Sequence, residues 1–104
     1  MSAPAAGRPL RVLLVDDDPG VRALVVHELG RDFPGVDVVE AGSAPDLEAT
    51  LAAGGYDAVV TDYQLRWADG LQVLKRAKER WPEAAVIMFT GTGSEERAGR
   101  RLRL

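Results

Sequence analysis

The segment LRVLLVDDDP, residues 10–19, joins a nearly continuous apolar run to three aspartates and a proline. A short apolar run of this kind is typical of a strand that is buried on both faces of a parallel sheet. The proline suits the first turn of a helix, and Asp18 suits the cap position before it. The segment therefore predicts a buried strand that leads through an acidic turn into a helix.

Further apolar runs of strand length follow along the chain. They lie at residues 36–41, 57–61 and 85–89, and each is bounded by glycine, proline or polar residues. The run at 57–61 is followed by Asp62, and the run at 85–89 is followed by Thr90 and Gly91. We expect three more short strands, two of which lead directly into residues that can do chemistry.

Helical segments lie between the expected strands. The first begins at Pro19 and ends within residues 30–34, the second runs from a Ser43 cap to residues 54–55, and the third runs from Gly70 to the residue before Pro82. Ser94 predicts the cap of a last helix, whose C-terminal end suits four arginines. These arginines are Arg97, Arg100, Arg101 and Arg103. The buried faces of the first and third helices are expected to hold Val21, Leu24, Val25, Leu29, Val73, Leu74, Ala77 and Trp81.

Strands that alternate with helices predict an α/β fold with a doubly wound parallel sheet, covered by helices on both faces. In such sheets the working site lies beyond the carboxyl ends of the strands. Asp16, Asp17, Asp62 and Thr90 all follow directly on expected strand ends. One edge of the sheet should therefore bring these four residues together.

Length and composition favour one soluble domain. The chain has 104 residues, 46% of them hydrophobic, with no cysteine and a formal net charge of -3. We expect a flexible arm at residues 1–9 and one domain at 10–104. Without a strong basic excess, an apolar signal segment or a membrane-length apolar run, we expect a cytoplasmic protein that binds neither nucleic acid directly nor a membrane.

Three converging carboxylates repel one another at neutral pH unless protons or a cation hold them together. Mg²⁺ fits, because it prefers oxygen ligands and binds through one or two carboxylates together with phosphate oxygens. A carboxylate beside that cation can act as a nucleophile toward a phosphoryl group. The Thr90 hydroxyl and the Gly91 backbone N–H could bind phosphoryl oxygens.

Four segments, taken in order, resemble response-regulator receiver domains of the CheY-like superfamily. They are VLLVDDDP at 12–19, YDAVVTDY at 56–63, Asp69-Gly70, and VIMFTG at 86–91. The resemblance runs from Leu10 to about Glu96 and implies a flavodoxin-like sheet with strand order 2-1-3-4.

The resemblance implies a role for each site residue. Asp62 would accept a phosphoryl group from a histidine kinase or phosphotransfer protein. Asp17 would bind Mg²⁺ directly, and Asp62 would also be a metal ligand. Asp16 would act through the metal or its water, and the Gln64 carbonyl would be a third protein ligand. Thr90 would be the switch hydroxyl, which moves toward the phosphoryl group and draws the neighbouring loop with it. An output domain or partner protein would recognise the changed surface. Enzymatic activity would be limited to self-phosphorylation from a phosphodonor and autodephosphorylation.

The chain departs from the family pattern at two places. Arg66 stands where the family usually has a proline, and we expect it to change the stiffness of that loop. The chain also stops before the expected fifth strand and fifth helix, and the lysine that would pair with the phosphoryl group is missing with them. We therefore expect an exposed edge on the fourth strand and a homodimer or domain swap through it. A chain boundary inside a longer protein and an altered reading after Glu96 are the rival explanations.

Two other functions stay open from the sequence. The pattern Asp16-x-Asp18 after an apolar strand also resembles haloacid-dehalogenase-type phosphatases, in which Asp16 would be the nucleophile. That reading leaves Asp62 and the Asp69-Gly70 turn unexplained. The other alternative is a degenerate receiver that acts only as a protein-interaction module.

Trp67 lies beside the proposed acceptor and could report metal binding by its fluorescence.

Overall fold

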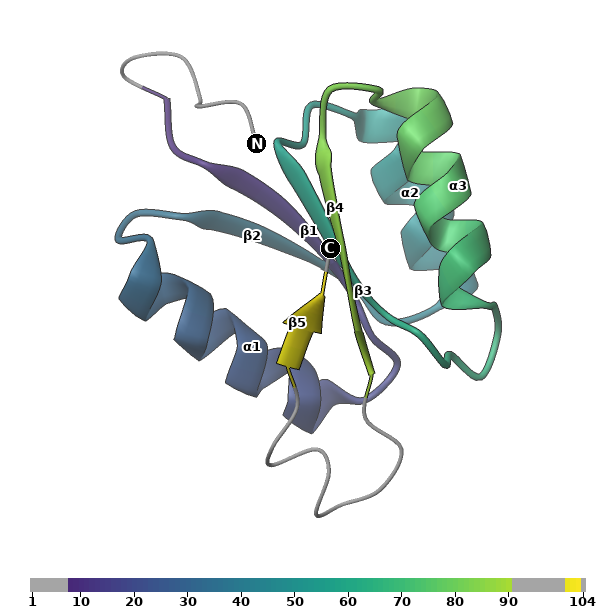
Figure 1. The fold of residues 1–104 in the computed structure, drawn as a ribbon, viewed down its shortest axis with the longest axis horizontal. Helices are drawn as coiled ribbons and strands as arrows, with labels where there is room; N and C mark the ends of the chain where they lie inside the picture. The colour runs from purple at the N-terminus through teal and green to yellow at the C-terminus, as the bar shows by residue number, and fades with distance from the viewer. Residues whose placement is uncertain (1–7, 91–100, 104) are drawn as a thin grey trace.

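The computed structural model describes residues 8–90 and 101–103. Its sheet has the strand order β2-β1-β3-β4-β5, in which β1, β2, β3 and β4 are parallel (Figure 1). The strands are β1 Arg11–Val15, β2 Asp37–Ala41, β3 Ala58–Asp62, β4 Ala85–Thr90 and β5 Arg101–Arg103. The helices are α1 Pro19–Asp32, α2 Ala44–Ala53 and α3 Gly70–Arg80. The predicted order 2-1-3-4 of the parallel strands is confirmed.

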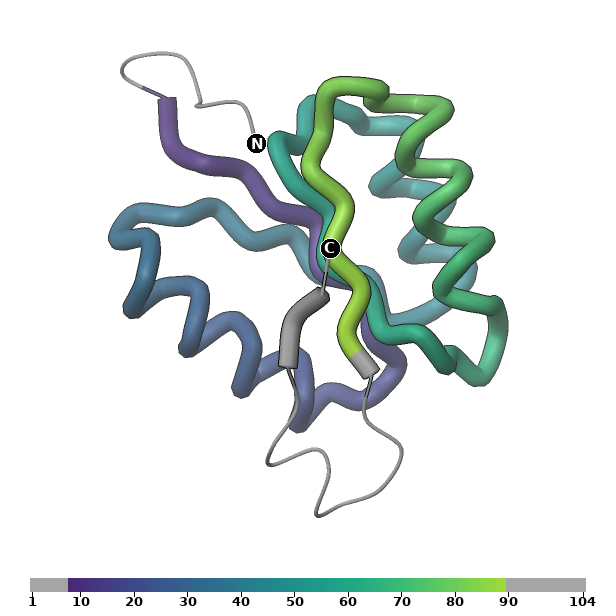
Figure 2. Tube along the Cα trace, viewed as in Figure 1, coloured from purple at the N-terminus to yellow at the C-terminus, as the bar shows by residue number. Residues whose placement is uncertain are grey.

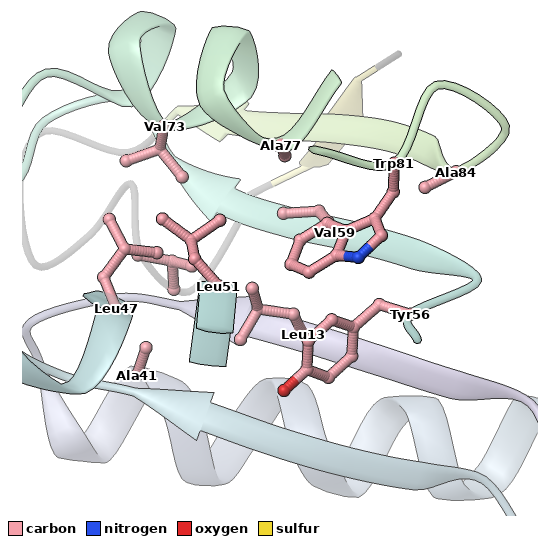
Figure 3. Close-up of a cluster of buried hydrophobic side chains, with 11 residues drawn as sticks. Leu13, Ala41, Leu47, Leu51, Tyr56, Val59, Val73, Ala77, Trp81 and Ala84 are labelled. Atoms are coloured by element: carbon pink, nitrogen blue, oxygen red, sulfur yellow. The ribbon is translucent and has the colours of Figure 1, made fainter. Parts of the chain in front are cut away.

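Helices cover both faces of the sheet, with α1 on one face and α2 and α3 on the other (Figure 1). On the α1 face, Val21, Val25 and Leu29 pack in one buried cluster with alternate residues of β1 and β3. On the opposite face, side chains from α2, α3 and the sheet meet in a second cluster (Figure 3). Its largest buried members include Leu13, Leu47, Leu51, Val59, Val73 and Trp81. Because β1 and β3 contribute to both clusters, they are buried on both sides, as their apolar sequences predict.

Helix caps lie where the sequence predicts them. The Asp18 side chain accepts from the backbone N–H groups of Gly20 and Val21, and Ser43 accepts from Asp46 at the start of α2. At the end of α2, Gly54 adopts a φ of 76°, a conformation that favours glycine. Local hydrogen bonding therefore sets these helix boundaries.

Two packing predictions are wrong in detail. Leu24, expected on the buried face of α1, is 49% exposed, and Leu74 of α3 is half-buried. In α1 the buried residues follow one another at intervals of four, so the contact stripe is narrower than a full apolar face. Leu24 lies beside this stripe.

The C-terminal arginines do not end a helix where the structure describes them. Arg101–Arg103 form β5, which pairs antiparallel with Met88, Phe89 and Thr90 of β4. An edge strand offers unpaired N–H and C=O groups, and pairing satisfies them. The predicted exposed edge of β4 is therefore covered over these three residues. The cap at Ser94, with Arg97 and Arg100, lies outside the described residues, and the homodimer or domain swap stays a prediction.

Candidate functional site

Three aspartates meet at the carboxyl edge of the parallel strands. Carboxylate oxygens of Asp16, Asp17 and Asp62 lie within 4.8 Å of one another. Asp16 is 0% and Asp62 2% exposed, while Asp17 is half-buried. The convergence predicted from the sequence is confirmed for these three residues, and solvent reaches the cluster from the side of Asp17.

The register of the sheet explains this meeting. Strands β1 and β3 run side by side in the interior of the sheet (Figure 2). In their register, Val15 pairs with Thr61. Asp16 follows the last residue of β1, and Asp62 is itself the last residue of β3 rather than the first residue after it. The two buried aspartates therefore leave neighbouring strands at the same level.

Local hydrogen bonds hold the acidic turn. The backbone N–H of Asp18 donates to Asp16 Oδ1 at 2.8 Å. The N–H of Asp16 donates to the carbonyl of Ala41 at 3.2 Å, which ties the turn to β2. Asp18 thus serves the turn as well as the cap of α1, the structural role that its position before Pro19 predicts.

Asp17 is held by the loop that follows β3. The backbone N–H of Arg66 donates to Asp17 Oδ2 at 2.9 Å, and the Arg66 Nε lies 3.6 Å from the same oxygen. The Arg66 side chain is 90% exposed. The sequence predicted a change in loop stiffness at this residue. The contact with Asp17 joins residues 49 positions apart and has no local sequence signal.

The loop between β3 and α3 folds back on itself beside Asp62. Gln64 and Asp69 form an isolated antiparallel β-bridge. The Gln64 backbone N–H donates to Asp62 Oδ1 at 3.4 Å. The Gln64 backbone therefore lies next to the acidic cluster, and the metal-ligand role of its carbonyl stays a prediction. A surface depression in this loop is lined by Tyr63, Gln64, Leu65, Ala68 and Asp69.

Gly70 lets α3 approach the end of β3 closely. A Cβ at this position would lie 2.4 Å from the Asp62 carbonyl oxygen and 2.8 Å from the Cα of Tyr63. The Gly70 N–H donates to the Tyr63 carbonyl at 2.9 Å. The sequence showed Asp69-Gly70 as part of a motif. The steric reason for the glycine appears only in the folded chain.

The structure describes the backbone of Thr90 but not Gly91. Thr90 is the last residue of β4, one residue beyond Phe89, which pairs with Asp62. Its backbone therefore lies at the same edge of the sheet as the aspartates. Gly91 lies outside the described residues.

The donor set of the cluster fits Mg²⁺. Its three side chains offer carboxylate oxygens alone, from two buried residues and one half-buried residue. Oxygen ligands and an open side for water are what Mg²⁺ requires, whereas zinc sites generally use histidine or cysteine. Because the carboxylates lie so close together, a cation among them would relieve their repulsion.

Comparisons with known proteins agree with this geometry. The family model described as response regulator receiver domain matches residues 12–104. The chain belongs to the response-regulator receiver family.

Several curated proteins resemble this receiver domain. The transcriptional regulatory protein AruR of Pseudomonas aeruginosa is 38% identical over 90 residues, covering 82% of this chain and 36% of AruR. The transcriptional regulatory protein TrcR of Mycobacterium tuberculosis is 39% identical over 90 residues, covering 86% of this chain and 34% of TrcR. The receiver domain thus spans about a third of these relatives.

Solved structures share the fold. The response regulator TrrA of Thermotoga maritima, solved in complex with Mg²⁺-BeF, matches with a TM-score of 0.69 and 28% identity over 86% of this chain and 75% of that one. A receiver domain from Pseudomonas fluorescens matches with a TM-score of 0.72 and 23% identity over 88% of this chain and 72% of that one, a likeness of fold alone. The flavodoxin-like receiver fold is confirmed.

None of the helices in the part of the chain that the structure describes is long and apolar enough to cross a bilayer.

Proposed function

We propose that this receiver domain accepts a phosphoryl group on Asp62, with Mg²⁺, from a histidine kinase or phosphotransfer protein. The observation that carries the proposal is the convergence of Asp16, Asp17 and Asp62 within 4.8 Å at the carboxyl edge of the sheet. The modified domain would then signal to an output domain or a partner protein through a change of conformation.

Asp62 is the proposed nucleophile. One of its carboxylate oxygens attacks the phosphorus atom of the donor, while the bond from phosphorus to the leaving group breaks. The electron pair of that bond leaves with the donor's imidazole, or with acetate when acetyl phosphate is the donor. The product is a mixed anhydride on Asp62. Its position at the end of β3, between two neighbouring strands, supports this role, because the strand holds the residue in one place.

Asp16, Asp17 and Asp62 are the proposed ligand carboxylates, and the Gln64 carbonyl is a further proposed ligand. When bound, Mg²⁺ offsets the negative charge of the carboxylates and of the incoming phosphoryl oxygens. Asp17, as the half-buried member, lies where solvent and donor can approach. Asp16 is fully buried, and the hydrogen bond from the Asp18 N–H to Oδ1 holds its carboxylate in place.

Thr90 and Gly91 are proposed to bind the phosphoryl oxygens after transfer. The position of the Thr90 backbone at the end of β4 supports this role for its hydroxyl. Movement of Thr90 toward the modified Asp62 would alter the segment that follows β4. A partner would recognise that altered surface.

The relatives support the proposal. AruR and TrcR are named transcriptional regulatory proteins. The TrrA structure contains Mg²⁺ and BeF, a group that stands in for a phosphoryl group. A match of this chain to receiver domains of such proteins favours phosphoryl acceptance over the phosphatase alternative.

Intact-mass measurement tests the proposal. The protein and its Asp62→Asn and Asp16→Asn variants are incubated with Mg²⁺ and acetyl phosphate. We expect the unsubstituted protein to gain one phosphoryl group, Asp62→Asn to gain none, and Asp16→Asn to gain it more slowly.

The alternatives predict different outcomes. Labelling that survives Asp62→Asn but is lost in Asp16→Asn would favour the haloacid-dehalogenase-type phosphatase. The same samples with beryllofluoride, followed by tryptophan fluorescence, separate binding from transfer. No response in any variant would leave the protein-interaction module.

A further inference from the structure

Arg22 on α1 reaches back to the acidic turn. Its Nη1 donates to the main-chain carbonyl oxygen of Asp16 at 2.6 Å, and its Nε donates to Glu40 Oε1 of β2 at 3.1 Å. The side chain is 19% exposed, well below the exposure of Arg66. One partly buried guanidinium thus joins α1, the end of β1 and the exposed Glu40 near the end of β2.

Gly42 leaves the space in which this guanidinium lies, here called its seat. A Cβ on Gly42 would lie 2.5 Å from Arg22 Nη1 and 2.9 Å from its Cζ. Gly42 is not among the glycines with positive φ, so its backbone conformation does not call for glycine. The missing side chain instead leaves room for the guanidinium to lie against the backbone that follows β2.

The contact fixes the peptide that links two site residues. The Asp16 carbonyl belongs to the same planar unit as the Asp17 N–H, so holding its orientation restricts the backbone between the two side chains. On the other side of Asp16, its own N–H is bonded to the Ala41 carbonyl at 3.2 Å. Asp16 is therefore clamped by β2 through its N–H and by Arg22 through its C=O.

We propose that Arg22, seated by Gly42, is a positioning residue that holds Asp16 and Asp17 in the geometry required for metal binding. The inference rests on the proposed function, because it assigns the support of the same acidic site. Arg22 touches no reacting atom. It acts through the Asp16 peptide, whose carbonyl accepts from its guanidinium.

Three substitutions separate the effect of the guanidinium's position from the effect of its charge. Arg22→Met removes the guanidinium and keeps an unbranched apolar side chain on α1. Gly42→Ala keeps Arg22 but fills its seat, so that the guanidinium must move. Arg22→Lys keeps the charge, but a single ammonium cannot reproduce two N–H bonds in the fixed directions of a guanidinium.

Calorimetric titration with Mg²⁺ alone tests the inference, with thermal unfolding measured on the same samples. Loss of a residue that orients metal ligands typically weakens binding by about 10- to 100-fold. We expect a weakening of about tenfold in Arg22→Met, at the lower end of that range because Arg22 acts through the backbone, and a smaller one in Gly42→Ala and Arg22→Lys. The double variant Arg22→Met/Gly42→Ala should bind Mg²⁺ as Arg22→Met does, because Gly42 acts through Arg22.

The matched control is Arg76→Met. Arg76 forms an ion pair with Glu48 on the exposed side of α2 and α3, away from the acidic turn. We expect its Mg²⁺ affinity to equal that of the unsubstituted protein, even where its thermal midpoint falls. A merely structural role for Arg22 predicts the same pattern in Arg22→Met, namely a lower midpoint with unchanged affinity.

The outcomes distinguish this inference from the proposed function. Mg²⁺ binding that Asp17→Asn weakens but Arg22→Met and Gly42→Ala leave unchanged would overturn the inference alone. Absence of Mg²⁺ binding by the unsubstituted protein would overturn both. If Arg22→Met does not fold, Gly42→Ala and Arg22→Lys decide the result, and weakened binding in both supports the inference.

Discussion

Asp17 receives two different contacts from one residue. The backbone N–H of Arg66 bonds to Oδ2, and the guanidinium of Arg66 adds a positive charge 3.6 Å from the same oxygen. The first contact is available to any residue other than proline. The second belongs to arginine and opposes a metal cation that uses Asp17.

Arg66→Ala separates these effects, because it keeps the N–H and removes the charge. We expect Mg²⁺ to bind about two- to threefold more tightly to the variant at low salt, in line with the small energies of exposed ion pairs. The gain should disappear in high salt, where exposed charges are screened. Titration calorimetry at two salt concentrations checks this. Arg66→Lys is the control and should bind Mg²⁺ as the arginine does, and weaker binding by Arg66→Ala would contradict the account.

Individual site residues differed in how well the sequence predicted them. Asp16, Asp17 and Asp62 could be found because each lies at the end of an apolar run, and parallel strands end at one edge. Arg22 and Arg66 could not, because their contacts with the acidic residues depend on the packing of α1 and the path of the loop after β3. Arginines on a helix or in a loop have no pattern that distinguishes them from solvated charges.

Among the elements, α3 begins in close contact with the end of β3 at the site. Gly70 begins the helix directly against the Asp62 carbonyl oxygen, where a Cβ would lie 2.4 Å away. The neighbouring atoms are backbone and cannot swing aside. The position of the first turn of α3 therefore depends on the position of the end of β3.

Gly70→Ala should destabilise the fold, because the added methyl group pushes α3 away from β3. We expect a loss of about 1–3 kcal/mol in the free energy of unfolding, the usual range for overpacking. Urea unfolding followed by circular dichroism measures it. Gly30→Ala in α1 is the matched control, since its Cβ would meet nothing within 4 Å. That substitution should be neutral or stabilising by up to about 1 kcal/mol, and equal losses in both variants would contradict the steric explanation.

Most helices and strands were predictable because local signals mark their ends. Asp18, Ser43 and Gly54 are the caps expected from their residue types. Arg101–Arg103 were predicted in a helix and form β5. Charge near a helix end is a weak signal, whereas the open hydrogen-bonding groups of β4 are a strong tertiary influence that the local sequence does not reveal.

Across the whole molecule, the end of the sheet opposite the acidic site has its own charged cluster. Asp57, directly before β3, accepts two hydrogen bonds from the Arg8 guanidinium and one from the backbone N–H of Arg11. The Arg8 hydrogen bonds, followed by the bond from Arg11, hold the pKa of Asp57 below its ordinary value. The two ends of β3 thus carry aspartates with different surroundings.

The lowered pKa of Asp57 makes stability depend on pH. A carboxyl group whose pKa is lower in the folded state stabilises the fold above its unfolded pKa, and this contribution is lost as pH falls through the folded pKa. Asp57→Asn should therefore be less stable than the unsubstituted protein at neutral pH, and the difference should shrink below about pH 4. Urea midpoints measured from neutral to acidic pH check this. A constant difference across that range would contradict the assigned ion pair.

The central claim is that Asp62 is the residue that accepts the phosphoryl group, and chemical mapping tests it most directly. The protein is incubated with Mg²⁺ and acetyl phosphate and then reduced with borohydride, which converts an aspartyl phosphate to homoserine. Peptide sequencing by mass spectrometry then locates the homoserine. The account predicts homoserine at residue 62, dependent on Mg²⁺ and lost in Asp17→Asn. Homoserine at residue 16 or 17 with residue 62 unchanged would contradict it.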